Sequence, residues 1–145
     1  MWRFLLFLYL LPLALSSERS LNRSDLSCSG KPHYNVTLAA YSPDYDSDDE
    51  SEYQDFKRKK LRTLQEFIDG RAKYVTVAMD LSALPYGSPI CIPELNEHFG
   101  RRINLQARDY DWSFNKTGFS RLDICVRSVM DTYDKAVNRA VTIYV

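Results

Sequence analysis

The sequence has no excess of charge of either sign, and this shortage excludes several classes of partner. Nineteen Lys and Arg residues balance nineteen Asp and Glu residues, so the formal net charge is zero. Proteins that bind nucleic acids or anionic membrane surfaces usually carry a surplus of basic residues. We therefore expect neither a nucleic acid nor a membrane surface as a partner.

Histidine and cysteine are also scarce, with two and three residues in the chain. Cys28, Cys91 and Cys125 stand far apart, and neither histidine lies at the spacing of a zinc site. The sequence therefore predicts no metal site and no cofactor. No strained-turn nucleophile motif accompanies His98, so a Ser/His/Asp hydrolase is not predicted either. We interpret His98 as an exposed loop residue.

A long apolar run occurs only at the start of the chain. Residues 4–14 are almost entirely apolar, follow Arg3 and precede small residues. This layout is typical of a signal peptide, and the run is too short and too broken by proline for a spanning helix, which needs about 20 residues. We expect cleavage after Ser16 or Ser17. Residues 1–17 are thus a predicted signal peptide, and the mature chain is expected to be secreted without a membrane anchor.

Three sequons and an odd number of cysteines agree with a secretory route. Asn22, Asn35 and Asn115 are each followed by the pattern of an N-glycosylation acceptor. Three cysteines allow one disulfide and one free thiol in three pairings, and an intermolecular bond stays open. Cys91 and Cys125 have apolar neighbours, so at least one should face inward. If Cys28 packs near Cys91 or Cys125, that pair should form the disulfide.

The mature chain has the length of one domain. Residues 18–36 are a polar N-terminal tail, and residues 37–145 form the expected domain, with a charged insertion over 42–73. The insertion holds an acidic run and then a basic run, so we expect it to be solvated and to project. A calcium loop is not predicted, because Asp49 occupies the position that needs glycine. Tyrosines among the acidic residues are candidates for sulfation.

The pattern of apolar residues predicts strands and few helices. An amphipathic helix is expected from about Asp55 to Asp69, and a helical turn is expected to open at Ser128 with Asp131 in a capping-box arrangement. Strands are expected at 35–41, 74–79, 88–93, 102–108, 122–126 and 140–145. These elements predict an all-β fold, a small six-stranded barrel with one or two short helices.

The order of motifs along the chain resembles the three-aspartate (3D) domain. This is the double-psi β-barrel module of bacterial cell-wall proteins and of membrane-bound lytic transglycosylase A, and expansins contain a related barrel. The matching motifs are Val36–Tyr41, Val77–Asp80 with Leu84–Ser88, Ile90–Pro93, Ala107–Asp109, Leu122–Cys125, Asp134–Ala136 and Val141–Val145. The resemblance implies a six-stranded double-psi β-barrel.

By this resemblance Asp80, Asp109 and Asp123 stand at the three aspartate positions of the family. In the similar transglycosylase the carboxylate at the position of Asp123 protonates the glycosidic oxygen and then acts as a base, while that of Asp109 assists. Two neighbouring carboxyl groups can raise the pKa of one of them, which suits such an acid. The alternative function is therefore a cell-wall polysaccharide-cleaving enzyme of lytic-transglycosylase type.

The loop after the second aspartate departs from the family pattern and favours binding over catalysis. Relatives have a glycine-rich stretch there, whereas residues 109–118 are rich in aromatics and include the Asn115 sequon. We expect an extracellular binding module for a polysaccharide or a protein partner, because aromatic rings supply large contact areas. Structural roles for the aromatics, as plugs at a barrel end, stay open. The expected binding residues are Asp80, Tyr110, Trp112 and Phe114.

Overall fold

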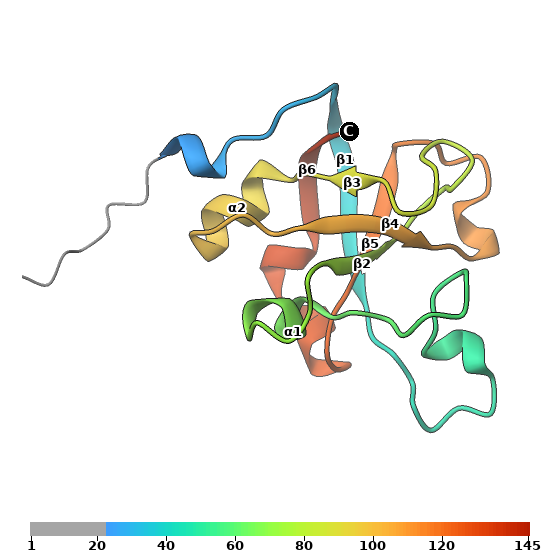
Figure 1. Ribbon diagram of the computed structural model, residues 1–145. Coiled ribbons are helices and arrows are strands. Elements are labelled where there is room, and N and C mark those ends of the chain that lie inside the picture. The colour runs from blue at the N-terminus through green and yellow to red at the C-terminus, as the bar shows by residue number, and fades with distance from the viewer. Residues whose placement is uncertain (1–22) are drawn as a thin grey trace, which may run out of the picture.

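Six strands of one sheet form the body of the protein in the computed structural model, which describes residues 23–145 (Figure 1). The expected signal peptide and the Asn22 sequon lie outside the described residues. The strands are β1 (Pro32–Tyr41), β2 (Val75–Ala78), β3 (Pro89–Ile90), β4 (Leu105–Asp109), β5 (Arg121–Cys125) and β6 (Arg139–Tyr144). The expectation of a mostly β fold is confirmed.

Helices are short and lie in the connections between strands. The α-helices are α1 (Leu64–Ile68) and α2 (Pro93–Phe99). The 3-10 helices are η1 (Arg23–Leu26), η2 (Glu50–Glu52), η3 (Trp112–Phe114), η4 (Met130–Tyr133) and η5 (Lys135–Val137). The helical turn expected near Ser128 is η4, and the Ser128 hydroxyl accepts a hydrogen bond from the Asp131 amide at 3.4 Å.

The sheet curls so that its two edges meet at one point. The strand order is β3-β4-β2-β5-β1-β6; β1 is parallel to β5, β2 is parallel to β4, and the other pairs are antiparallel. Just after β3, Cys91 exchanges two backbone hydrogen bonds of 3.0 and 2.9 Å with Tyr144 of β6. This bridge joins the edge strands at one end of a curled half-barrel, a shape that fits a small β-barrel.

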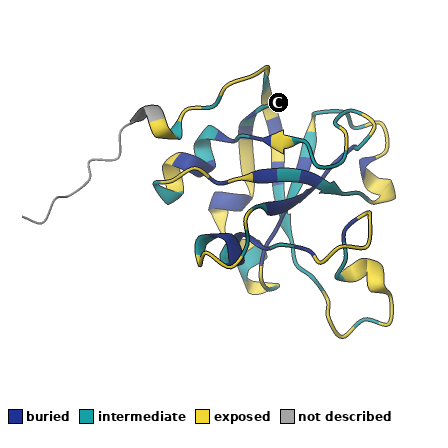
Figure 2. Cartoon of the chain, in the orientation of Figure 1, coloured by how far each residue is buried: buried dark blue, intermediate teal, exposed yellow. Residues whose placement is uncertain are grey.

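The core lies inside this curl, and its residues follow the alternation of the strands (Figure 2). Ile103, Leu105 and Ala107 are fully buried, as the alternating pattern predicted. All four residues of β2 are buried, because β2 lies between β4 and β5 while α1 packs against it. Strand β2 is thus one of the two central strands of the sheet, and the functional groups described below lie next to it.

The helix predicted over residues 55–69 is wrong in its first half. Helix α1 begins only after Thr63, whose side chain accepts from the Glu66 amide in a complete capping box. Before it, the Asp55 carboxylate accepts from the amides of Lys57 and Lys59, both at 2.9 Å. These bonds close a tight turn in place of helical hydrogen bonds. The four basic residues at 57–60 therefore lie on a turn and not on a helix.

The strand predicted over 88–93 is also too long, and His98 is not a loop residue. Strand β3 ends at Ile90. Pro93 occupies the first position of helix α2, where the backbone N–H that proline lacks would have no partner within the helix. Gly100 ends α2 in a left-handed conformation with φ of 63°. His98 is exposed as predicted, but it lies in the last turn of this helix.

The cysteines form one disulfide, between Cys28 and Cys91, and leave Cys125 free and buried. One bridge and one inward-facing thiol were expected, and both are confirmed. The buried Asn96 side chain supports the bridge: its Nδ2 donates to the Leu26 carbonyl at 3.2 Å, and its Oδ1 accepts from the Ile103 amide at 2.9 Å. The segment before β1 is thereby tied to α2 and β4.

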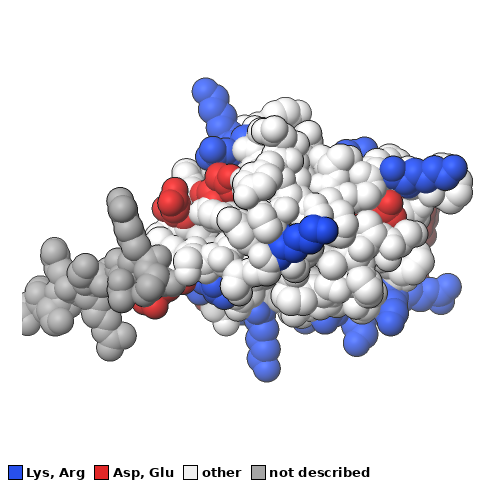
Figure 3. All heavy atoms as spheres, turned by 90° about the horizontal axis from the view of Figure 1, so that it is seen from above, with Lys and Arg blue, Asp and Glu red and all other residues white. Residues whose placement is uncertain are grey.

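The disulfide is compatible with an extracellular location, where such bonds persist. Within residues 23–145, no helix combines the length and the apolarity needed to cross a membrane. On the face shown in Figure 3, most Lys and Arg side chains are spread around the outline of the molecule, and one lies across its middle.

Candidate functional site: an acidic pocket

The register of the strands brings two of the three candidate aspartates to either side of one residue. Ala78 of β2 pairs with Asp109 of β4 on one side and with Asp123 of β5 on the other. A bulge makes Arg108 the extra residue, so Asp109 rather than Arg108 lies opposite Ala78. With neighbouring strands about 4.8 Å apart, the two aspartate Cα atoms are separated by roughly 10 Å.

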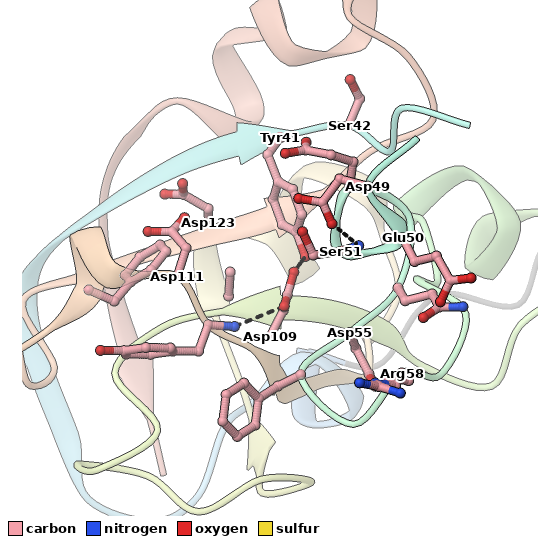
Figure 4. A pocket seen from close by; sticks show the side chains of 16 residues that line it. Tyr41, Ser42, Asp49, Glu50, Ser51, Asp55, Arg58, Asp109, Asp111 and Asp123 are labelled. Atoms are coloured by element: carbon pink, nitrogen blue, oxygen red, sulfur yellow. Dashed lines mark hydrogen bonds between the residues drawn. The ribbon is translucent and has the colours of Figure 1, made fainter. Parts of the chain in front are cut away.

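Both aspartates line a pocket of about 560 Å³ that is open to solvent. One wall belongs to the barrel and the other to the segment between β1 and α1 (Figure 4). Besides Asp55, its acidic lining residues are Asp49, Glu50, Glu52, Asp109, Asp111 and Asp123. Arg58 is the single basic residue among the lining residues, all of which lie in the described part of the chain. We call this site the acidic pocket.

Asp109 is the most strongly perturbed carboxyl group of the pocket. Burial raises its pKa to about 6, even though the Tyr110 amide and the Tyr41 hydroxyl each donate to it at 2.9 Å. The nearby charges of Asp55 and Asp111 raise the pKa further. Asp109 is therefore partly protonated near neutral pH and can exchange a proton with a ligand.

We expect Asp109→Asn to stabilise the fold at pH 7.5 by on the order of 2 kcal/mol and to have little effect at pH 4. A raised native pKa makes the folded state hold its proton longer than the unfolded state. The contribution of Asp109 to stability is therefore present below about pH 4 and is lost as the pH rises through about 6. Urea unfolding of both proteins across this range measures the difference.

The matched control is Asp131→Asn. The Ser128 hydroxyl, above all, and Arg127 lower the pKa of Asp131, so this substitution should destabilise the protein above the unfolded pKa. The pH dependence then has the opposite sign. Equal pH profiles for Asp109→Asn and the wild type would contradict the prediction.

Asp123 differs from Asp109 in its partners. Burial raises its pKa, and the Arg121 guanidinium, 3.5 Å from Oδ2, opposes this rise. Its Oδ1 is buried and has no hydrogen-bond partner among the described residues. Buried polar atoms without a partner are uncommon in folded proteins, and this one sets Asp123 apart from Asp109.

A phenol and a thiol lie close to Asp109, and burial disfavours the ionised form of both. Tyr41 of β1 stands in register with Cys125 of β5. Burial raises the pKa of Tyr41 and also that of Cys125, to which the charge of Asp109 adds. Both groups stay protonated, so Tyr41 serves Asp109 as a donor and the thiol is unreactive.

The third candidate aspartate, Asp80, does not line the acidic pocket. Its carboxylate accepts from the Ser82 amide and from the Gly118 amide, both at 3.0 Å. These hydrogen bonds, with that of Gly118 as the largest cause, lower the pKa of Asp80. Asp80 thus braces the loop between β4 and β5 against the end of β2.

The three aromatic candidates of that loop separate in the structure. Phe114 is fully buried, with the Arg121 guanidinium 4.4 Å from the centre of its ring, and it is one of the residues that line the acidic pocket. Tyr110 lines the acidic pocket, with the Phe56 ring edge-on at 5.9 Å. Trp112 is 79% exposed but is not one of the pocket's lining residues.

Two sequon asparagines can be placed on the surface. Asn35 is exposed at the bulge of β1, with a left-handed φ of 54° that Asn tolerates. Asn115 is exposed at the end of η3 and does not line the acidic pocket. A glycan at either position stays a prediction, and Asn22 lies outside the described residues.

The sequence did not point to the second wall of the pocket. The charged insertion was expected to project, whereas Asp55 is buried and the Phe56 amide donates to the Arg108 carbonyl at 3.0 Å. Tyr41 was also missed, although β1 lies next to the strand of Asp123 and the Tyr41 hydroxyl donates to Asp109 at 2.9 Å. The burial of Asp55 has no local signature, because Tyr86 and Arg108, which contact its Oδ2, are distant in sequence.

Comparisons with known proteins add no relative to this picture. A scan against protein-family models and a search of the curated proteins both found no match. The resemblance to the 3D domain therefore stays a prediction from motifs. Among the described residues, no group of three or more His, Cys, Asp or Glu side chains is placed to hold a metal ion.

Proposed function

We propose that the protein is an extracellular binding module and that the acidic pocket is its ligand site. The observation that carries the proposal is an open pocket in which carboxylates greatly outnumber the one basic residue. The curled six-stranded sheet, with Asp109 and Asp123 on either side of Ala78, is consistent with the 3D-type double-psi barrel, which we propose as its topology.

The pocket favours a carbohydrate that carries amino groups. Ammonium groups complement the carboxylates, and carboxylate oxygens also accept hydrogen bonds from sugar hydroxyls. The rings of Phe56 and Tyr110, in contact with each other, offer apolar faces to a pyranose ring. A basic protein segment would also bring positive charge to the carboxylates. It would gain less binding free energy than a sugar from contact with the rings of Phe56 and Tyr110.

Short oligomers of glucosamine and of N-acetylglucosamine test this proposal, because they share a backbone and differ in charge. At pH 6, calorimetric titration is expected to show about tenfold tighter binding of the glucosamine oligomers. If the protein binds oligolysine but neither sugar oligomer, the ligand of the acidic pocket is a basic protein segment and not a carbohydrate. No binding of any of the three probes would reject the acidic pocket as a ligand site.

We expect Glu50→Lys to weaken binding of the glucosamine oligomers by about tenfold. Glu50 is exposed, lines the pocket, and changes the local charge by two units when replaced. The matched control is Glu97→Lys, which changes an exposed glutamate of α2 outside the acidic pocket and should leave the affinity unchanged. Added salt should reduce the difference between the variants.

A second candidate function, cleavage of a glycosidic bond, is favoured by one specific observation. Burial raises the pKa of Asp109 to about 6, within the range of a general acid near neutral pH. The resemblance assigns the acid role to Asp123, which lines the same pocket. This second function would require that the wild-type protein cleaves a cell-wall polysaccharide.

A further inference from the structure

A buried carboxylate outside the Asp109–Asp123 pair connects the two walls of the acidic pocket. The segment of residues 44–60 is charged and mostly exposed, yet the side chain of its Asp55 has no exposed surface. Burying a carboxylate is costly unless it is hydrogen-bonded or paired. Every contact of Asp55 therefore bears on how this segment is held.

The two oxygens of Asp55 have different partners. Oδ1 accepts from the amides of Lys57 and Lys59 and so closes the turn within the segment itself. Oδ2 accepts from the Tyr86 hydroxyl at 2.6 Å and lies 3.9 Å from Nη1 of Arg108. One oxygen thus shapes the turn, and the other binds the barrel.

The barrel side of this contact is already ordered. Arg108 donates to the Gln106 side chain at 2.8 Å and to the Tyr86 hydroxyl at 3.1 Å, and its guanidinium lies 4.1 Å from the centre of the Tyr74 ring. Burial, followed by the bond to Asp55, raises the pKa of Tyr86 to about 12, so the phenol remains a donor. The backbone bond from Phe56 to Arg108 adds a second attachment.

The segment held in this way supplies the outer wall of the acidic pocket. Asp49, Glu50, Glu52 and Phe56 all line the pocket from the segment, opposite the carboxylates of β4 and β5. In Figure 4, Asp49 and Glu50 lie on the side of the pocket that this segment forms, Asp123 lies on the opposite side, and Asp109 lies between them.

We propose that Asp55 is a positioning residue of the ligand site: its bonds to Tyr86 and Arg108 dock the 44–60 segment, whose acidic wall then selects positively charged ligands. The inference rests on the proposed function and deepens it. Because the attachments of the segment are few, loss of the Oδ2 bonds should release the wall without unfolding the barrel.

Asp55→Asn and Tyr86→Phe test the docking from its two sides. Asn keeps an acceptor for the two turn amides but places an NH₂ group where Tyr86 and Arg108 need an acceptor. Phe removes the hydroxyl and keeps the ring. Each variant is expected to raise amide hydrogen exchange in residues 44–60 by about tenfold, with no change in the β5 amides. The double variant should be no worse than either single one.

Ligand selectivity is the measurement that would stay unchanged if Asp55 had only a structural role. The preference for glucosamine over N-acetylglucosamine oligomers should fall from about tenfold towards equality in both variants. Asp46→Asn is the matched control, because it removes a charge from an exposed aspartate of the same segment that does not line the pocket. It should change neither exchange nor selectivity.

Each possible result decides between the alternatives. Faster exchange with unchanged selectivity would overturn the inference and leave the proposed function standing, because the wall would then not take part in binding. Unchanged exchange in both variants would overturn it as well. Failure of the wild type to bind either oligomer or oligolysine would instead reject the proposed function, and this inference with it.

Discussion

Cys28→Ser/Cys91→Ser is expected to lower the free energy of unfolding by about 4 kcal/mol. The disulfide joins residues separated by 63 positions, and a cross-link of this span strongly restricts the unfolded chain. The bond also ties the segment before β1 to the point where Cys91 meets Tyr144, so its loss loosens the closure of the sheet. Urea unfolding of the oxidised wild type and of the double variant measures the effect.

Reduction of the wild type provides the control for this prediction. It should give the same stability as the double variant, because the buried Cys125 thiol is in no disulfide in either protein. Peptide mapping of the secreted protein should find Cys28 linked to Cys91 and Cys125 alkylated only after unfolding. Three free thiols in the native protein, or a loss below about 1 kcal/mol, would contradict the assignment.

Asp123→Asn separates the two candidate functions by the largest margin. If the protein cleaves glycans, loss of the acid should lower the rate by roughly a hundredfold to ten-thousandfold. We expect instead that the wild type shows no turnover and that the substitution changes the affinity for glucosamine oligomers by no more than about threefold. The reason is that Arg121 already offsets the charge of Asp123.

The assay uses peptidoglycan-type and chitosan-type polymers, with release of reducing or anhydro ends as the measurement. Arg121→Gln is the companion variant: it leaves Asp123 without its cation, so ammonium binding should tighten. If the wild type cleaves a polymer and Asp123→Asn does not, glycan cleavage is the correct function. Preserved cleavage in Asp123→Asn would exclude Asp123 as the acid.

Local patterns predicted the parts of the fold that depend on local physics. The alternation over 103–107 places one face of a strand in the core, because side chains of a strand point to opposite faces in turn. The Ser128 turn was found from its capping residues. In contrast, α2 was missed because Pro93 both ends strands and opens helices, and the choice depends on the buried Leu95 and Asn96.

The candidate site was predicted only in its barrel half. Asp109 and Asp123 were named from motif order, and strand pairing brings both next to Ala78. The acidic wall from the 44–60 segment could not be predicted, because the bond from Tyr86 to Asp55 spans 31 positions and competes with a helix that the local pattern favours. Long-range hydrogen bonds of this kind leave no periodic signal.

By itself, the sequence determined the mostly β class of fold, which follows from the order of side chains along the chain, and it made one disulfide and one free thiol the simplest count for three cysteines. The two pocket aspartates were named through the resemblance to the 3D domain. Only the tertiary structure decided that Asp80 braces a loop, that Phe114 is buried against the acidic pocket, and that Asp55 docks a charged segment as the wall of that pocket. These outcomes depend on which groups lose water on folding, and burial is a property of the assembled sheet.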